Sequence, residues 1–197
     1  MTDARVVVLA SGSGSLFQAL VDQQAKIGIH IVALVVDKDV PAVGRAQAAG
    51  ISVIEVPMLG ERSQWDQVME NVLTDLVPDL IISAGFMRVL GANVVNKFAD
   101  KLINTHPALL PMFPGAHAVR DALAAGAVVT GTTVHFVDAG VDTGPIIAQR
   151  EVEIIPGDTQ ESLHERIKAV ERELLVSTVH NLVTGKIALI EGKVVAQ

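Results

Sequence analysis

The chain has 197 residues, half of them hydrophobic and only 3% aromatic, with a formal net charge of −7 and no cysteine. This length most simply makes one domain with a sizeable core, and the acidic balance provides no basic surface for nucleic acid. Disulfides and thiolate metal sites are excluded, and we expect a cytoplasmic protein. No apolar stretch approaches the ~20 residues of a membrane span, and we expect no signal peptide before the first strand.

Apolar strands alternate with helical patterns through the first half of the chain. We expect strands at 6–10, 29–36, 52–56 and 80–82, with helices beginning near Leu16 and covering 42–49 and 62–76. In the last of these helices the apolar residues recur at the helical period, and Pro78 stops it. This alternation is typical of a parallel sheet with right-handed crossovers.

The second half changes character after a proline-rich loop at 107–114. We expect two strands at 132–137 and 146–152, a long helix and a terminal hairpin at 187–195. For the helix we expect Asp158 as the cap, with Glu161 completing a capping box. Its expected buried stripe is Leu163, Ile167, Val170 and Leu174. The predicted fold class is therefore α/β: a single-domain, Rossmann-like, open twisted sheet over 1–197, mostly parallel with an antiparallel portion in the C-terminal half, and helices on both faces.

The turn at 11–15 reads Ser-Gly-Ser-Gly-Ser between a strand and a helix. Glycines permit close backbone approach, and the helix start supplies N–H groups, so the turn is typical of a phosphate cradle. The alternative is a tight turn that binds nothing. A dinucleotide fingerprint fits poorly because Phe17 occupies its third glycine position, and Asp37 alone is a weak ribose signal.

Asn104 and His106 lie two residues apart near the end of an apolar run, which places both side chains on one face of a strand. An amide donates to a developing oxyanion, and an imidazole moves protons near neutral pH. Asp142, in a later turn, is suited to set the protonation state of that imidazole. No nucleophilic side chain accompanies the three, which favours direct transfer between two bound substrates.

The remaining polar candidates are weaker. His135 alternates with apolar residues in a strand and is interpreted as structural, whereas His117 is a candidate for lining a site. The histidines have no metal-ligand spacing, so we expect no metal. Lys168 and Glu171 share a helix face that we expect to lie opposite the buried stripe, where the simplest interpretation is a solvated ion pair.

Five segments in order resemble the folate-dependent formyltransferase family. They are residues 11–15 (SGSGS), 84–90 (AGFMRVL), 104–111 (NTHPALLP), 131–137 (GTTVHFV) and 141–147 (VDTGPII). The resemblance implies transfer of the formyl group of 10-formyltetrahydrofolate to the amine of 5-phosphoribosylglycinamide in purine biosynthesis. It also implies small-molecule partners only, with no metal, nucleic acid or membrane, in a monomer or homodimer.

The resemblance also assigns residues. The implied catalytic trio is Asn104, His106 and Asp142. About 1–100 becomes the half that binds the ribotide phosphate, and about 101–197 the catalytic and folate-binding half. The ribotide residues implied are Ser13, Gly14, Ser15, Leu16, Lys168 and Glu171. The folate residues implied are Arg62, Met87, Arg88, Val89, Leu90, Asn104, Val137, Asp138, Val141 and Asp142.

Departures and alternatives accompany this resemblance. Many relatives carry Asn where this chain has Leu16, so one side-chain contact to the phosphate is expected to be lost, and some carry a second histidine where Val119 stands. Methionyl-tRNA formyltransferase shares the trio but needs a further domain and a basic surface. Formyltetrahydrofolate deformylase uses water as the acceptor and usually has an N-terminal regulatory domain. A non-catalytic folate- or nucleotide-binding module is the alternative from another class, and the intact trio argues against it.

Overall fold

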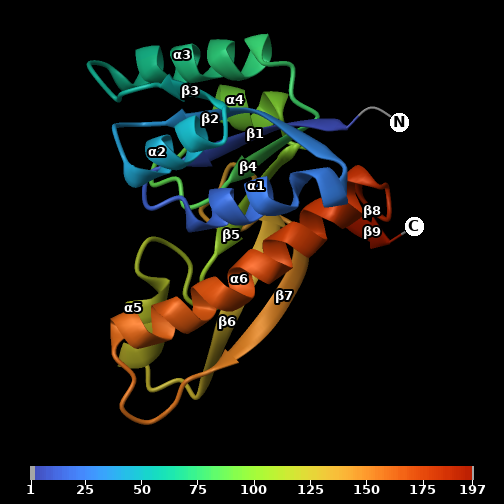
Figure 1. Ribbon diagram of the computed structural model, residues 1–197. Helices are drawn as coiled ribbons and strands as arrows, with labels where there is room; N and C mark the ends of the chain where they lie inside the picture. Colours follow the sequence, from blue (N-terminus) through green and yellow to red (C-terminus); the bar gives the residue numbers. More distant parts are fainter. Residues whose placement is uncertain (1–2, 197) are drawn as a thin grey trace. The chain divides into compact units, whose positions relative to one another are not determined.

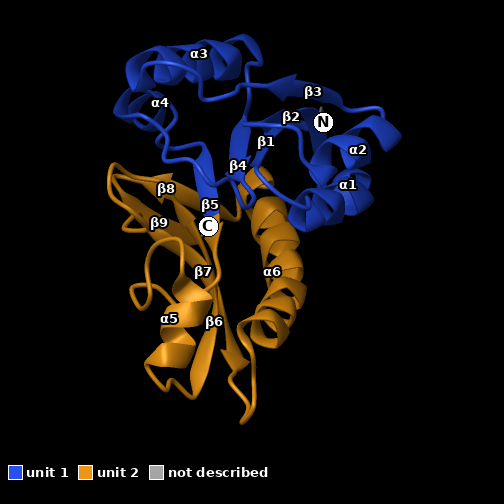
Figure 2. Cartoon of the chain, turned by 90° about the vertical axis from the view of Figure 1, so that its left-hand side faces the viewer, with its two compact units in different colours: residues 1–104 blue, residues 105–197 orange. Residues whose placement is uncertain are grey.

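The computed structural model describes residues 3–196 and divides into two compact units, residues 1–104 and 105–197 (Figure 2). The single domain expected over 1–197 includes Met1, Thr2 and Gln197, which lie outside the described residues.

Unit 1 is a parallel sheet with helices on both faces. Its strands run in the order β3-β2-β1-β4-β5, and every pairing between them is parallel. Helices α1 and α2 cover one face, and α3 and α4 cover the other (Figure 1). The elements are β1 Ala4–Ala10, α1 Ser15–Ile27, β2 Ile29–Val36, α2 Pro41–Ala48, β3 Ser52–Glu55, α3 Arg62–Asp75, β4 Leu80–Ser83, α4 Ala92–Lys97 and the first part of β5 Leu102–His106, whose last two residues belong to unit 2.

The middle of this sheet positions the functional loops. Strand β1 is fully buried over 6–9, as expected for a parallel strand covered by helices on both faces. Chain order reverses beside β1, with β2 on one side and β4 on the other. Open α/β sheets bind ligands at such a reversal, beyond the carboxyl ends of the strands. The turn at 11–15 and the loop at 84–91 both begin there.

Unit 2 is built around an antiparallel strand pair and a long helix. Strands β6 and β7 pair from Val129 opposite Glu153 to His135 opposite Ile146, and α6 packs against both strands. Buried apolar residues on α5, β7 and α6 form one cluster: Val119, Val152, Leu163 and Ile167. The elements are α5 Ala118–Ala124, β6 Val129–Phe136, β7 Ile146–Glu153, α6 Gln160–Val183, β8 Ile187–Ile190 and β9 Lys193–Ala196.

The predicted fold class is confirmed. The strand order β3-β2-β1-β4-β5-β6-β7 gives a mostly parallel sheet with an antiparallel end, and β8-β9 is a separate hairpin. Two helices, α4 and α5, were not expected. Both are shorter than two turns, too short for an apolar period to show.

The predicted cap of the long helix is wrong by one residue. Thr159 caps α6, its hydroxyl accepting from the Ser162 N–H while the Ser162 hydroxyl accepts from the Thr159 N–H. Asp158 is instead bound by Arg166, which holds the pKa of that carboxyl well below its usual range. The Asp158 carboxylate is therefore engaged by Arg166, and Thr159 caps the helix instead.

The expectation that Glu171 faces away from the buried stripe is also wrong. Glu171 is only 5% exposed and lies among the buried residues of α6, between Ile167 and Leu174. Val170, expected in the stripe, is only partly buried. The ion pair of Lys168 is with Glu165 and not with Glu171: its Nζ lies 2.8 Å from the Glu165 carboxylate.

Candidate active site

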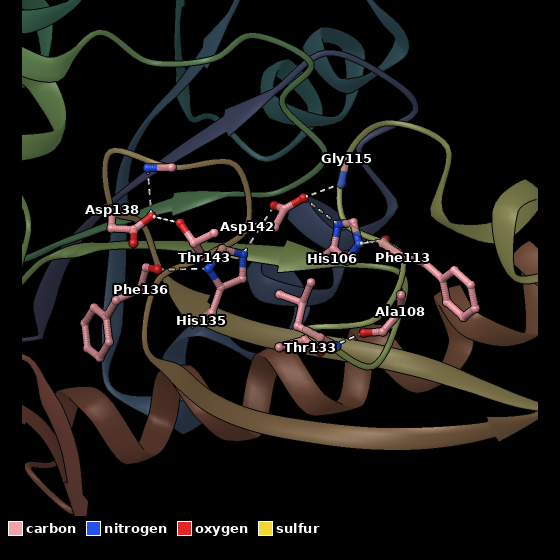
Figure 3. A network of polar contacts seen from close by, with 12 residues as sticks. His106, Ala108, Phe113, Gly115, Thr133, His135, Phe136, Asp138, Asp142 and Thr143 are labelled. Carbon is pink, nitrogen blue, oxygen red and sulfur yellow. Dashed lines mark hydrogen bonds and ion pairs between the residues drawn. The ribbon is translucent and has the colours of Figure 1, made fainter.

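A buried imidazole–carboxylate pair forms the centre of the candidate site in unit 2. His106 ends β5 and is 4% exposed, and its Nδ1 lies 3.3 Å from Oδ2 of Asp142 (Figure 3). Asn104 lies two residues earlier in the same strand, so its side chain leaves the same face as His106. The structure thus brings His106 and Asp142 into contact from segments 36 residues apart.

The loop before α5 contacts both members of this pair. His106 Nε2 lies 2.8 Å from the Phe113 carbonyl oxygen, and the Gly115 N–H donates to Asp142 Oδ2 at 2.8 Å. A carbonyl only accepts, so Nε2 carries a proton. Nδ1 faces the Asp142 carboxylate, so both ring nitrogens of His106 lie against hydrogen-bond acceptors.

Asp142 is held ionised beside two histidines. Burial alone would raise its pKa, but hydrogen bonds from His135 and the Gly115 N–H, together with the charges of His106 and His135, lower it to about 2. Its backbone φ of 55° is in the left-handed region, which Asp tolerates better than most residues. Asp142 is therefore a carboxylate throughout the neutral range.

From the sequence, His135 was interpreted as structural, but in the structure it also contacts Asp142. It is buried in β6, with Nδ1 2.8 Å from the Phe136 carbonyl and Nε2 3.6 Å from Asp142 Oδ1. Thr133, on the same strand face, donates to the Ala108 carbonyl and accepts from the Leu110 N–H, anchoring the proline-rich loop (Figure 3). The alternating sequence predicts that Thr133 and His135 share one strand face, but it does not predict which groups they contact. His117, the other candidate for lining the site, is the N-cap residue of α5.

The 137–144 loop that carries Asp142 is closed by local contacts. Asp138 Oδ1 accepts from the Gly140 N–H and the Thr143 hydroxyl, at 3.0 Å and 2.7 Å. A side chain at Gly144 would place its Cβ 1.8 Å from the Phe136 carbonyl oxygen, so only glycine fits. Val137 is partly buried and Val141 is 56% exposed. Asp138 thus shapes the loop, while Val141 leaves an apolar side chain accessible.

The glycine turn of unit 1 presents backbone groups at the start of α1. Gly14 precedes the helix with φ 71°, and no side chain caps it, which leaves N–H groups of the first turn available. A Cβ at Gly14 would lie 2.7 Å from the Ala42 Cβ. Leu16 is buried, so its side chain faces the core and only its backbone is offered to a ligand. Ser13 is exposed and Ser15 partly exposed.

The loop after β4 carries the predicted folate residues 87–90. Met87 and Val89 are each 64% exposed, while Leu90 is partly buried. Arg62 bonds to the Val89 carbonyl and to Asp66 at 2.9 Å, and it lies over the ring of Trp65. The Arg88 guanidinium pairs with Asp37. The loop therefore presents apolar side chains, while Arg88 of the loop and Arg62 of α3 are both engaged within unit 1.

Glu171 and Lys168, the other ribotide candidates, lie on α6 in unit 2. Burial raises the pKa of Glu171, opposed by a hydrogen bond from Thr105 and by the charges of Lys168 and Arg172. A buried ionisable side chain of this kind is more typical of a functional group than of a surface ion pair.

Two kinds of feature are absent from the described residues. Over residues 3–196 there is no group of three or more His, Cys, Asp or Glu side chains placed to hold a metal ion. Within the same range, no helix has the length and apolar character needed to cross a membrane.

The fold is that of a known family. Residues 4–179 match the model of the formyl transferase family, and the chain belongs to that family. A Mycobacterium tuberculosis protein named phosphoribosylglycinamide formyltransferase is 48% identical over 192 residues, covering 95% of this chain and 88% of that protein. The crystal structure of glycinamide ribonucleotide transformylase 1 from Symbiobacterium toebii superposes with a TM-score of 0.94 at 34% identity, covering 99% and 94% of the two chains.

A third comparison shows what the fold alone does not decide. The structure of a formyltetrahydrofolate deformylase from Pseudomonas syringae superposes with a TM-score of 0.92, covering 98% of this chain and 66% of the other. The identity is only 22%, so this likeness concerns the fold. The same architecture therefore occurs in proteins named as a formyltransferase and as a deformylase.

Proposed function

We propose that this chain is a phosphoribosylglycinamide formyltransferase, which moves the formyl group of 10-formyltetrahydrofolate to the amine of 5-phosphoribosylglycinamide. Family membership and the 48% identity to a protein of that name support the reaction. The observation that carries the chemistry is the buried contact of His106 with ionised Asp142. We place the reaction in the cytoplasm, in a monomer or homodimer with small-molecule substrates only.

Asn104 and His106 stabilise the oxyanion that forms when the ribotide amine attacks the formyl carbon. Each such donor contributes about 3 kcal/mol to the transition state in related oxyanion sites. Asp142 balances the charge of the imidazolium, and with bound water it moves the proton from the attacking amine toward the departing folate nitrogen. The transfer is direct, with no acylated protein side chain.

The ribotide phosphate binds the turn at 13–16 through backbone N–H groups. The uncapped start of α1 and the accessible Ser13 support this assignment. Lys168 and Glu171 hold the rest of the ribotide. Lys168 is then released from Glu165, a contact between partly exposed side chains that costs little to break.

The folate contacts the loops that carry Met87 and Val141. Their apolar side chains are more than half exposed and so are accessible to a ligand. Backbone groups of 87–90 and 138–142 supply the polar recognition of the pterin. Arg62 lies beside this loop through its bond to the Val89 carbonyl.

A single-turnover assay tests the proposed function. Purified protein and 10-formyltetrahydrofolate are mixed with the ribotide, with no acceptor, or with tRNA, and formylated products and free formate are measured. We expect formylated ribotide only in the first mixture. Equal formate release without the ribotide would instead assign a deformylase, formylated tRNA a tRNA formyltransferase, and no consumption of the formyl donor a binding module.

A further inference from the structure

The turn after β1 and the loop after β4 are hydrogen-bonded to each other within unit 1. The Ser11 N–H donates to the Gly85 carbonyl at 3.2 Å, and the Ser11 hydroxyl oxygen accepts from the Met87 N–H at 2.9 Å. Ser11 is 9% exposed, so water competes little for these bonds. The first residue of the phosphate turn therefore fixes the backbone of the folate loop.

Asp37, at the carboxyl end of β2, provides a second connection. Its side chain is almost fully buried, and Arg88 Nε donates to its Oδ2 at 2.7 Å. Burial alone would raise the pKa of Asp37, but the Ser11 hydroxyl and the Arg88 guanidinium outweigh that effect and lower it. Ser11 and Asp37 thus each bond to the loop at 85–88, Ser11 to the Met87 N–H and Asp37 to the Arg88 side chain.

The rest of the phosphate turn is held from its other side. The Gly12 carbonyl accepts from the Ala42 N–H at 3.3 Å, and the Ser13 carbonyl accepts from Arg45 Nε at 2.8 Å. The turn is therefore bound to α2 through two carbonyls and to the loop at 85–88 through Ser11.

We propose that Ser11 and Asp37 are positioning residues that couple ribotide binding to folate binding through this hydrogen-bonded network. The inference rests on the proposed function, in which the turn binds the phosphate and the 87–90 loop binds the folate. The ribotide orders the turn, Ser11 and Asp37 hold the loop, and folate then binds a loop that is already ordered. The Arg88 side chain is accordingly an anchor of this loop rather than a folate ligand.

Coupling between two ligands is measured directly by titration. The affinity for tetrahydrofolate, which has no formyl group to transfer, is determined calorimetrically with and without saturating ribotide. In the natural protein we expect the ribotide to tighten tetrahydrofolate binding by about fivefold or more, and the reciprocal titration to give the same factor. Ser11→Ala and Asp37→Asn should each bring that factor close to one.

The double variant sharpens the assignment. Because Ser11 and Asp37 act in one network, Ser11→Ala/Asp37→Asn should lose no more coupling than the more affected single variant. Arg88→Lys retains a cation that can reach Asp37 and should keep more coupling than Arg88→Met. Ribotide affinity measured alone should change little in the Asp37 and Arg88 variants, a pattern that general unfolding does not produce.

Glu70→Gln is the matched control. It breaks another ion pair of unit 1, between Lys97 Nζ and Glu70 at 3.0 Å, outside the network. This variant should keep the natural coupling factor. If Ser11→Ala does not fold, as judged from its thermal unfolding, Asp37→Asn carries the test.

Two outcomes overturn the inference: no coupling in the natural protein, or undiminished coupling in Asp37→Asn. Neither depends on turnover. A protein that formylates the ribotide but shows no coupling keeps its proposed function and loses only this inference, whereas failure of the transfer assay removes the function itself.

Discussion

The His106 cluster of unit 2 and the glycine turn of unit 1 present different kinds of chemical group to a ligand. The cluster consists of buried side chains, with an ionised Asp142 between two imidazoles. The turn consists of backbone N–H groups, and Gly14 matters for the side chain that it lacks. Substitutions in the cluster should therefore affect the chemical step, whereas substitutions in the turn should affect binding by changing backbone shape.

The largest expected effect is on turnover in Asp142→Asn. The amide keeps the size of the side chain but removes the charge that balances the imidazolium. We expect kcat to fall by about 10² or more, with the KM for the ribotide nearly unchanged, in steady-state assays. A comparable rise in that KM would show that Asp142 acts in binding rather than in the chemical step.

His106→Ala tests whether the pair acts as one unit. Its loss of kcat should be similar to that of Asp142→Asn, and the double variant should be little slower than either single variant. A double variant as slow as the product of the two losses would contradict the coupled mechanism. Mass spectrometry that found a formylated side chain would contradict direct transfer.

Gly14→Val tests the role of the glycine turn in binding. A Cβ at this position meets the Ala42 Cβ at 2.7 Å, and the φ of 71° disfavours a β-branched residue. We expect the KM for the ribotide to rise by roughly tenfold or more, about 1.4 kcal/mol of binding, with a much smaller change for the folate. Equal changes for both substrates would argue against phosphate binding by the turn.

Gly50→Val is the matched control for that experiment. Gly50 has a similar φ of 68°, but a Cβ there would meet no atom within 4 Å. This variant carries the backbone strain without the clash and outside the turn. It should lower the melting temperature while leaving both KM values close to those of the natural protein.

A smaller effect is expected when His135 is replaced by Leu. The hydrogen bond from His135 helps to lower the pKa of Asp142 to about 2, so its removal should raise that pKa toward the usual 3.8. A depressed carboxyl pKa contributes stability above the unfolded value and loses it as the pH falls through the folded value. The acid-unfolding midpoint, followed by circular dichroism, should therefore move to higher pH.

His30→Leu controls for the loss of a titratable ring. His30 is exposed in β2 and has no carboxylate ion pair among the described residues. It should leave the acid midpoint unchanged. If His135→Leu behaves the same way, His135 does not set the ionisation of Asp142 and its original structural interpretation stands.

The same contrast explains which parts of the structure the sequence predicts. Strand β1, the glycine turn and helix α3 follow from local period and turn chemistry, so their positions match the prediction closely. The cap of α6 was misplaced because Arg166, eight residues away, binds Asp158. Local pattern does not register a competitor at that distance.

The candidate site shows the same limit. Strand spacing predicts that Asn104 and His106 share one face, and the turn at 138–142 makes Asp142 a candidate partner for the imidazole. The contact of His135 with Asp142 depends on how the 137–145 connection folds back onto β6, which no local signal in the sequence reveals. Glu171 was misplaced because charged residues are normally assigned to the solvent face, and buried ionisable groups at functional sites depart from that rule.

Glu171→Gln carries the smallest expected effect, and on stability its sign is opposite to that of the other substitutions. Burial raises the pKa of Glu171, so the fold favours the protonated carboxyl. The stability from that preference is fully present below the unfolded pKa and is lost as the pH rises through the folded one. Because Gln resembles the neutral form at every pH, the variant should melt at a higher temperature than the natural protein at pH 8.

That gain should shrink toward pH 4, where the natural protein also carries a neutral side chain at this position. Glu173→Gln is the control on the same helix, since Glu173 is exposed and its 3.5 Å contact with Arg150 lies at the surface. It should shift the melting temperature little at either pH.

The proposed function adds a second readout, because Glu171→Gln should weaken ribotide binding while it stabilises the protein. A variant that is less stable at pH 8 would show that the ionised carboxylate is well accommodated in the folded protein, and one with unchanged ribotide affinity would remove Glu171 from the binding site.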